Sequence, residues 1–215
     1  MNELVEVLKN NDFPVLFRDK DILNLDFNRK NAEKLFKEAI SKKWIKNVYE
    51  NIYTLSKEYR KTLISGCVLS QMIEPESYTS SYYVLSMKAW IPEFVYTVTN
   101  ITERNKRLVD TNGFGRYEYE DIFNNLNNVG IIEEENDNGK YKIAKPLRAL
   151  CDLLIERKEL YDNMNIVCNV FRIDYGCFDE LNSGDFDELQ GNFNVLNIEN
   201  FLENTRKELR LWMIL

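Results

Sequence analysis

The sequence predicts an α+β protein in which an N-terminal winged helix-turn-helix precedes a mixed α/β C-terminal domain. The first observation is the order of patterns in the first 60 residues, where three helical segments are followed by a β-hairpin. The second is the alternation of strand-like and helical patterns further along the chain. With 215 residues, 44% of them hydrophobic, the chain can bury a sizeable core. We therefore expect residues 1–60 to form one domain and residues 61–215 to form the other.

The composition narrows the possible functions. No apolar run approaches the roughly 18 residues that a membrane-spanning helix needs, and the charges within MNELVEVLKNNDF argue against a signal peptide, so we expect no membrane contact. The chain has no histidine, which excludes histidine-ligated zinc and nucleophile–histidine pairs. We expect no cofactor and no metal. Widely spaced cysteines indicate reduced core thiols in a cytoplasmic protein: they are Cys67, Cys151, Cys168 and Cys177.

Three helices are expected before residue 45. The stretch LVEVLKNND carries apolar residues at helical spacing, and the following FPVLFR is extended, as its proline favours. DKDILNL predicts a second helix with Asp19 as its N-cap. Asn28 can cap a third helix that runs from Arg29 to about Lys43.

The third predicted helix has one apolar face and one basic face. Its apolar residues follow the spacing i, i+3, i+4, i+7 and i+8 of a single buried face: they are Ala32, Leu35, Phe36, Ala39 and Ile40. At about 100° per residue, the opposite direction is occupied by what we call the lysine row, namely Lys30, Lys34, Lys37 and Ser41. A merely solvated helix would mix both signs of charge on this face. Residues 29–61 contain ten basic and four acidic residues, although the whole chain has a formal charge of −7.

A β-hairpin is predicted directly after this helix. In WIKNVYENIYTLS, two short apolar runs flank a turn at Tyr49, Glu50 and Asn51. In a winged helix-turn-helix the third helix enters the major groove and the hairpin flanks it, and lysines on that helix contact phosphates and release counterions. The predicted DNA-binding residues are therefore Asn28, Arg29, Lys30, Asn31, Lys34, Lys37, Ser41 and Lys46.

Two considerations keep the role of this region open. Glu50 places an acid at the tip of the hairpin, where a phosphate contact would favour glycine, lysine or arginine. If the hairpin contacts DNA, it does so through Lys46, Asn47 or Asn51, or not at all. The alternative is that the helical bundle is only a docking or tethering domain.

The rest of the chain predicts an alternating series of elements. EYRKTLISGCVLSQM predicts a helix that ends at residues 74–76, and another helix begins near residues 79–81 and stops before Pro92. FVYTVTNI alternates as a half-buried strand should, and Asn112-Gly113 lies between two such runs, which is a strong hairpin signal. YKIAKPLRALCDLLI predicts a strand that runs into a helix with Pro146 in its first turn.

These segments, in this order, resemble the AbiEi family, the antitoxin component of bacterial abortive-infection toxin–antitoxin pairs of type IV. The motifs that carry the resemblance are YTSSYYVLSMKAWIPEFVYTVT, DTNGFGRYEYEDI and YKIAKPLRALCDLL, followed by FRIDYGCFDELNSGDFDELQGNFNVLNIENFLE. Family members show a Ser-Ala-Leu-rich helix before Ile-Pro-Glu, a Y-T-V-T-like strand, a G-R-F-x-Y strand and an I-A-x-P-x-K-A-L-x-D-L helix start at these places. The resemblance covers roughly residues 15 to 205.

The resemblance implies a transcriptional regulator that represses its own operon by binding inverted repeats in double-stranded promoter DNA. It also implies a functional partner in phage defence, a nucleotidyltransferase-like toxin that the antitoxin counters without a stable complex. In the family, basic residues of the third helix lie on DNA, which here would be Arg29, Lys30, Lys34 and Lys37. The chain departs from the family pattern at two places where members have glycine: it has Glu50-Asn51 at the hairpin turn and Lys88-Ala89-Trp90 after the Ser-Ala-Leu helix.

Two other functions are compatible with the sequence. A protein-interaction module could neutralise a partner toxin without binding DNA. A carboxylate-dependent nuclease would need converging acids, for which Asp152 and Glu156 on one helix face are the candidates, with the triplet at residues 133–135. We interpret Asp152 as a buried capping or hydrogen-bonding group and the triplet as an exposed strand end, and expect no enzymatic activity. We interpret the basic cluster at residues 104–107 as a solvated turn, the alternative being a second phosphate contact.

Overall fold

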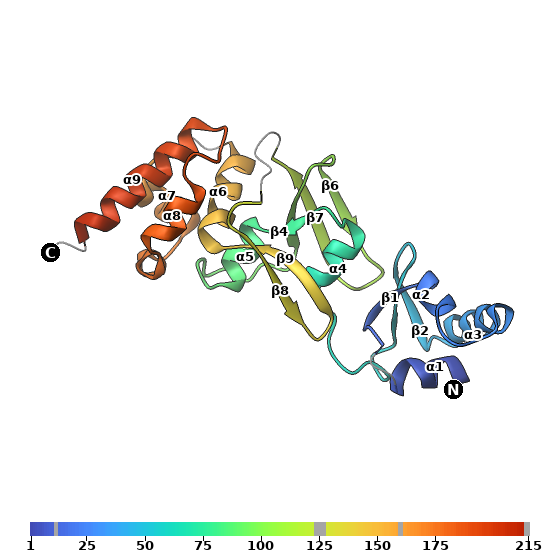
Figure 1. Cartoon of the computed structure of the whole chain (residues 1–215). Coiled ribbons are helices and arrows are strands. Elements are labelled where there is room, and N and C mark those ends of the chain that lie inside the picture. Colours follow the sequence, from blue (N-terminus) through green and yellow to red (C-terminus); the bar gives the residue numbers. More distant parts are fainter. Residues whose placement is uncertain (11–12, 123–127, 159–160, 213–215) are drawn as a thin grey trace. The chain divides into compact units, whose positions relative to one another are not determined.

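The computed structural model shows a mixed α+β protein (Figure 1), which confirms the predicted fold class at that level. It describes residues 1–10, 13–122, 128–158 and 161–212. The chain divides into two compact units. The first comprises Met1–Pro75, Asp110–Gly115 and Glu135–Tyr141, and the second comprises Glu76–Val109, Arg116–Glu134 and Lys142–Leu215. The domain boundary expected between residues 60 and 61 lies inside the first unit and stays a prediction.

The first unit contains the elements expected from the first 60 residues. In chain order they are α1 (Glu3–Asn10), β1 (Leu16–Arg18), α2 (Asp19–Leu23), α3 (Arg29–Ser41), β2 (Ile45–Tyr49) and β3 (Ile52–Leu55), after which comes α4 (Gly66–Ile73). The strands form a small antiparallel sheet with β3 in the middle. Glu50 and Asn51 make the turn between β2 and β3, as predicted, whereas Tyr49, also predicted in the turn, is the last residue of β2.

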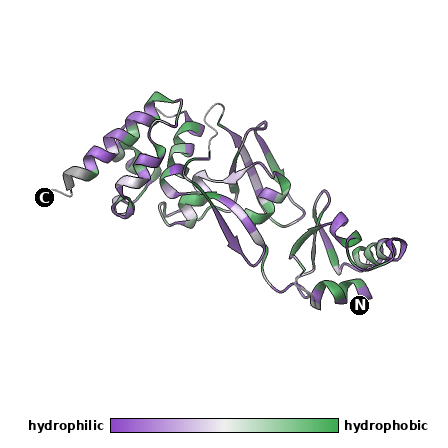
Figure 2. Ribbon diagram, in the orientation of Figure 1, coloured by the Kyte–Doolittle hydropathy of each residue, from purple (hydrophilic) through white to green (hydrophobic). Residues whose placement is uncertain are grey.

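The core of the first unit joins one face of each of the first three helices to this sheet. Its buried residues are Leu4, Val5, Leu8, Phe17, Ile22, Ala32, Ala39, Ile45 and Leu55. On α3, Ala32 and Ala39 are fully buried, and Leu35 and Phe36 are half-buried. The prediction that Ile40 is buried is wrong, since it is 36% exposed. It lies about 80° around the helix from Ala32, at the edge of the apolar face; Figure 2 shows hydrophobic and hydrophilic residues alternating along α3.

α3 stops at Ser41, two residues before the predicted end at about Lys43. The backbone amides of Lys43 and Trp44 donate to the carbonyls of Ile40 and Ala39, both at 2.9 Å. Lys43 has a φ of +59°, the left-handed conformation that commonly closes a helix at this position. Trp44 packs against the core cluster, so tertiary packing supports a helix end that has no glycine to mark it.

Two predicted helix starts in the first unit are displaced. Asp19 is the first residue of α2 rather than its N-cap, because the Asp21 carboxylate accepts the backbone amide of Arg18 at 2.7 Å. The helix predicted from residue 58 begins only at Gly66, where the Ser65 side chain caps it. The prediction is therefore wrong for residues 58–65.

The second unit is built on a six-stranded mixed sheet. The ends of three of its strands, at Asp110, residues 135–136 and residues 139–141, are grouped with the first unit. In sheet order its strands are β6 (Arg107–Asp110), β7 (Arg116–Asp121), β5 (Val98–Thr102), β4 (Tyr78–Thr79), β9 (Gly139–Ala144) and β8 (Ile131–Asn136). β5 pairs in parallel with β7, and β4 with β9, whereas β4 and β5 are antiparallel. The hairpin predicted at residues 112–113 is confirmed. Figure 2 colours β8 hydrophilic, in line with the glutamates at 133–135.

Helices accompany the sheet and continue to the C-terminus. α5 (Ser81–Met87) contacts α6 (Pro146–Arg157), and α9 (Leu196–Trp212) contacts α6, α7 (Met164–Phe171) and α8 (Ser183–Leu189). A short 3₁₀ helix, Tyr175–Glu180, precedes α8. The start of α6 at Pro146 confirms the prediction from that proline. None of the helices that the structure describes has the length and apolar character needed to cross a membrane.

Two boundaries around α5 differ from the prediction. The helix ends at Met87 rather than just before Pro92, because Ala89 takes a left-handed φ of +58° and the amide of Trp90 returns to the carbonyl of Leu85 at 2.8 Å. The strand predicted to start at residue 94 begins at Val98. The segment between them therefore forms a loop rather than helix or strand.

No disulfide joins the four cysteines, all of which lie in the described part of the chain. Cys67, Cys151 and Cys168 are buried, as predicted, and Cys177 is half-buried. Burial raises the pKa of Cys168 to about 12. Such a thiol is protonated near neutral pH and behaves as an apolar core group.

A fully buried ion pair connects α6 to β4 and the residues beside it. Nε of Arg148 lies 2.8 Å from Oδ1 of Asp152, and neither side chain is exposed. Arg148 also donates to the Tyr78 hydroxyl (2.7 Å) and the Val129 carbonyl (2.9 Å), and Asp152 accepts from the Ser80 hydroxyl (2.6 Å). Burial of charges is tolerated when they are paired and hydrogen-bonded in this way. The predicted buried hydrogen-bonding role of Asp152 is confirmed.

Arg148→Met should reduce the free energy of unfolding by about 3–5 kcal/mol, because it leaves the Asp152 carboxylate buried without its counter-charge. The double variant Arg148→Met/Asp152→Asn should recover much of this loss, since it removes both charges and keeps an amide for Ser80 and Tyr78 to contact. Urea denaturation at pH 7 measures both effects. A single variant within about 1 kcal/mol of the parent would show that the pair contributes little.

A second, partly exposed ion pair joins the start of α6 to α8. Nζ of Lys145 lies 2.6 Å from Oε2 of Glu188, and Glu188 also accepts the backbone amide of Gly130 at 3.1 Å. The hydrogen bond from Lys145, more than any other contact, lowers the pKa of Glu188 below its ordinary value. A lowered pKa means that the ionised carboxylate stabilises the fold above the ordinary value of about 4.3, and that this stabilisation is lost as the pH falls through the folded value.

Glu188→Gln should therefore lower the free energy of unfolding at pH 7, by less than about 1 kcal/mol because the pair is partly exposed. The difference from the parent should shrink toward zero at about pH 3, below the ordinary glutamate pKa. Urea denaturation at the two pH values provides the comparison. An equal deficit at both would mean that the carboxylate's charge is not the cause.

Candidate nucleic-acid interface

The lysine row lies along the exposed face of α3. Asn28 caps the helix as predicted, its side-chain oxygen accepting the backbone amide of Lys30 at 3.1 Å. Because Ala32 and Ala39 face the core, the row on the other side faces outward. All eight predicted DNA-binding residues are exposed; seven lie on or next to α3 and the eighth on β2, and they are Asn28, Arg29, Lys30, Asn31, Lys34, Lys37, Ser41 and Lys46.

The acids of α3 do not neutralise the lysine row. Glu33 pairs with Arg29 (Oε1 to Nε, 3.3 Å), and Glu38 accepts the side-chain amide of Asn2 at 3.2 Å. Within the described residues, the three lysines of the row form no ion pair. Arg29 is thus the member of the predicted set whose charge is compensated, and the uncompensated charge lies on Lys30, Lys34 and Lys37.

Two neighbouring residues of the hairpin after α3, Lys46 and Asn47, differ in how far their side chains are engaged within the fold. Lys46 is exposed on β2. The Asn47 side chain donates to the carbonyls of Glu50 (2.7 Å) and Ile52 (3.3 Å), and its oxygen accepts the side-chain amide of Asn112, within the same unit, at 2.7 Å. Asn47 therefore shapes the turn and holds Asn112, which leaves it poorly suited to contact a ligand.

Arg18 is a basic residue near the turn that the sequence analysis does not assign. Its Nη1 donates to the side-chain oxygen of Asn51 at 2.7 Å, and its Nη2 donates to the backbone carbonyl of Met72 at 2.5 Å. The guanidinium thus ties β1 to the turn and to α4. No local pattern marks this role, because the partners lie 33 and 54 residues away. With Asn51 engaged as well, Lys46 is the hairpin residue best placed for a phosphate contact.

Glu50, at the tip of the hairpin, has a backbone φ of +41°. This left-handed region favours glycine, because a side chain there meets its own backbone. The position is the one where the resemblance leads us to expect glycine. Its exposed carboxylate would repel the negatively charged phosphates of DNA. The hairpin tip is therefore the least favourable part of this surface for DNA binding.

The basic cluster of the second unit is engaged within that unit. Lys106 pairs with Glu120, and the guanidinium of Arg107 lies 4.9 Å from the centre of the Tyr119 ring. These contacts support the interpretation as a turn rather than as a second phosphate contact. We therefore keep the candidate interface on α3 and β2.

The carboxylates considered for catalysis do not converge on a metal position. Oδ1 of Asp152 accepts from Arg148, and Oδ2 accepts from Ser80 and Tyr78. Glu156 accepts the Ser81 hydroxyl at 2.9 Å. Among the described residues, no group of three or more histidine, cysteine or acidic side chains could hold a metal ion.

Two comparisons, with protein-family models and with curated proteins, found no relative. No protein-family model matches the chain. No curated protein matches it either.

Glu50→Gly should raise the free energy of unfolding by up to about 1 kcal/mol, because glycine takes the left-handed conformation without steric cost. Glu50→Ala removes the same carboxylate but keeps a Cβ, so it should bring little or no gain. Urea denaturation of the two variants separates the effect of the backbone from that of charge. Equal stabilisation by alanine and glycine would assign the gain to charge.

Proposed function

We propose that this chain is a DNA-binding transcriptional autorepressor and the antitoxin of a type IV toxin–antitoxin pair, acting in the cytoplasm. The observation that carries the DNA-binding part is the exposed lysine row on α3, whose three ammonium groups have no acidic partner among the described residues. A duplex phosphate backbone is the polyanion that such a row would meet. The antitoxin part rests on the resemblance to the AbiEi family.

The order of elements supports a winged helix-turn-helix. α1, α2 and α3 are followed by the β2–β3 hairpin, and β1 pairs with β3. We interpret α2 and α3 as the helix-turn-helix and the hairpin as the wing. In this arrangement α3 would enter the major groove with its alanine face toward the protein and its lysine row toward the DNA.

The row extends along two turns of α3. Lys30 and Lys37 are seven residues apart, which is about 10 Å along a helix at 1.5 Å per residue, and the phosphates of one DNA strand follow one another at about 3.4 Å along the duplex axis. The lysines would contact phosphates, and Lys46 would extend the contact from β2. Asn31, exposed on the same helix, has an amide of the kind that pairs with the N6 and N7 atoms of adenine.

The antitoxin activity would belong to the second unit and its partner would be a nucleotidyltransferase-like toxin, countered without a stable complex. The second unit carries most of the residues in the motifs of the resemblance, and we propose no catalytic role for its carboxylates. Expression of the chain together with such a toxin should restore growth, and the toxin should elute alone when the two are purified. Recovery of a stable complex would favour an interaction module in place of this proposal.

Lys30→Glu/Lys34→Glu should abolish binding to a promoter duplex with inverted repeats, because it replaces two phosphate contacts with repulsion. Lys30→Ala/Lys34→Ala should weaken binding and reduce the slope of log K against log salt by about 2. Fluorescence anisotropy across a salt series measures both. Both positions are exposed, so urea denaturation should show the fold unchanged.

The matched control is Lys57→Glu/Lys207→Glu, which changes the net charge equally at exposed positions outside α3. It should retain most of the affinity and the parent salt slope. Full affinity of Lys30→Glu/Lys34→Glu, or equal loss in the control, would refute the role of the lysine row.

A further inference from the structure

The strand β2 contains a β-bulge. Two consecutive pairs of the β2–β3 ladder, Asn47–Tyr53 and Tyr49–Ile52, are two residues apart on β2 but one residue apart on β3, so Val48 is an extra residue without a counterpart. β2 is also an edge strand of the small sheet, with β3 on one side only. A bulge bends its strand and changes the direction of the side chains beside it. The position of this strand therefore depends on what contacts its other side.

Asn112 holds the bulge from outside the small sheet. It belongs to what we call the β6–β7 turn (Asp110–Gly115), which is part of the first unit. The backbone amide of Asn112 donates to the Val48 carbonyl at 3.0 Å, and its side chain donates to the side-chain oxygen of Asn47 at 2.7 Å. The Asn47 side chain in turn donates to the carbonyl of Glu50 at 2.7 Å. Hydrogen bonds thus connect the β6–β7 turn to the bulge and to the tip of the β2–β3 hairpin.

The β6–β7 turn is itself closed by internal hydrogen bonds. The backbone amide and the hydroxyl of Thr111 both donate to the carbonyl of Gly115, at 3.1 Å and 2.7 Å. Gly113 and Gly115 have φ values of +83° and +108°, which glycine adopts without steric cost. The Phe114 ring centre lies 5.8 Å from the guanidinium carbon of Arg60, in the segment after β3. The turn therefore offers β2 a support that is fixed at a second place in the first unit.

This support leaves Lys46 open to a ligand. Successive side chains of a strand point to opposite faces. Asn47 is half-buried and bonded to Asn112, whereas Lys46, the residue before it, is exposed. The contacts made by Asn112 therefore hold the strand without covering the ammonium group.

On the basis of the function proposed above, we propose that Asn112 is a positioning residue of the DNA interface. It holds the bulge of β2 in the conformation from which Lys46 reaches a phosphate, and it makes no contact with DNA itself. A lysine that extends from a fixed strand loses less conformational freedom on binding than one that extends from a mobile strand. Loss of the Asn112 side chain would therefore reduce the contribution of Lys46 and leave that of the lysine row unchanged.

Fluorescence anisotropy with the promoter duplex across a salt series tests this role. Lys46→Ala should lower the slope of log K against log salt by about 1, the contribution of one phosphate contact. Asn112→Ala changes no charge, yet it should lower the slope by about 0.5–1 through Lys46. It should weaken binding by about twofold to tenfold, the range for one lost hydrogen bond. Lys46→Ala/Asn112→Ala should bind no more weakly than Lys46→Ala.

Asn138→Ala is the matched control. Asn138 lies in the turn between β8 and β9, also in the first unit, where it donates to the carbonyl of Leu63 and accepts the amide of Ser65, both at 2.9 Å. Its substitution removes similar hydrogen bonds but none on β2, so it should keep the parent salt slope and an affinity within about twofold of the parent. Urea denaturation should show that both asparagine variants are folded under the assay conditions.

The possible failures are distinguishable. The parent slope in Asn112→Ala or in Lys46→Ala, an equal loss in Asn138→Ala, or a further loss in the double variant would each overturn the role of Asn112, and the lysine row would keep its role. If the parent chain does not bind the duplex, the proposed DNA binding and the role of Asn112 are both refuted.

Discussion

The orientation of α3 depends on the burial of Ala32 and Ala39 against the core of the first unit. Two methyl-sized side chains bring this side of the helix close to its neighbours, and Leu35 and Phe36 pack at the edges. Since the helix can bury only this side, the lysines at the opposite angle are exposed together. The Asn28 cap and the left-handed Lys43 set the two ends, so that the row begins and stops within a single helix.

The hairpin after α3 is shaped by interactions that use its polar side chains internally. The Asn47 side chain donates to the carbonyl of Glu50 in the turn and accepts a hydrogen bond from Asn112. The Asn51 side chain accepts a hydrogen bond from Arg18. A side chain with its hydrogen bonds satisfied inside the fold has little to gain from a ligand. The residues still available for a ligand are therefore the lysine row and Lys46. Glu50 is an acid in a backbone conformation that favours glycine.

The two units differ in the charge that they present. The first carries the lysine row, whereas the second carries the acidic segment at residues 174–188. Within the second unit, the Arg148–Asp152 pair joins α6 to β4, and both of its side chains are fully buried. Charge of opposite sign on different surfaces of one chain favours partners of different charge at those surfaces.

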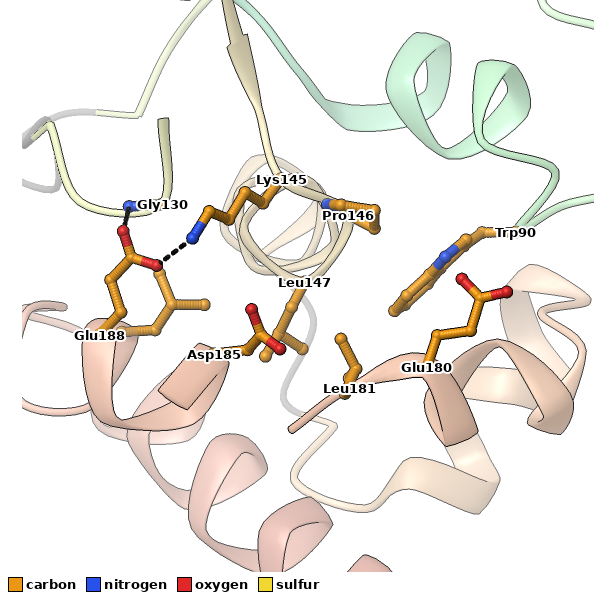
Figure 3. A pocket seen from close by; sticks show the side chains of 10 residues that line it. Trp90, Gly130, Lys145, Pro146, Leu147, Glu180, Leu181, Asp185 and Glu188 are labelled. Atoms are coloured by element: carbon orange, nitrogen blue, oxygen red, sulfur yellow. Dashed lines mark hydrogen bonds and ion pairs between the residues drawn. The ribbon is translucent and has the colours of Figure 1, made fainter. Parts of the chain in front are cut away.

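What the sequence by itself determined are the features written in local periodicity: the helical face of α3, its Asn28 cap, the hairpin at residues 112–113, the proline start of α6 and the burial of Asp152. Each depends on residues within a few positions of one another. The ends of α3 and α5 without glycine, the late start of α4 and the exposure of Ile40 were decided by packing. The roles of Arg18 and Asn47 required partners 33 to 65 residues away. Side chains this distant in the sequence meet only in the folded chain, so no local sequence pattern can predict their contacts. The same holds for the cavity beside the start of α6 that Trp90 and Glu180 both line (Figure 3).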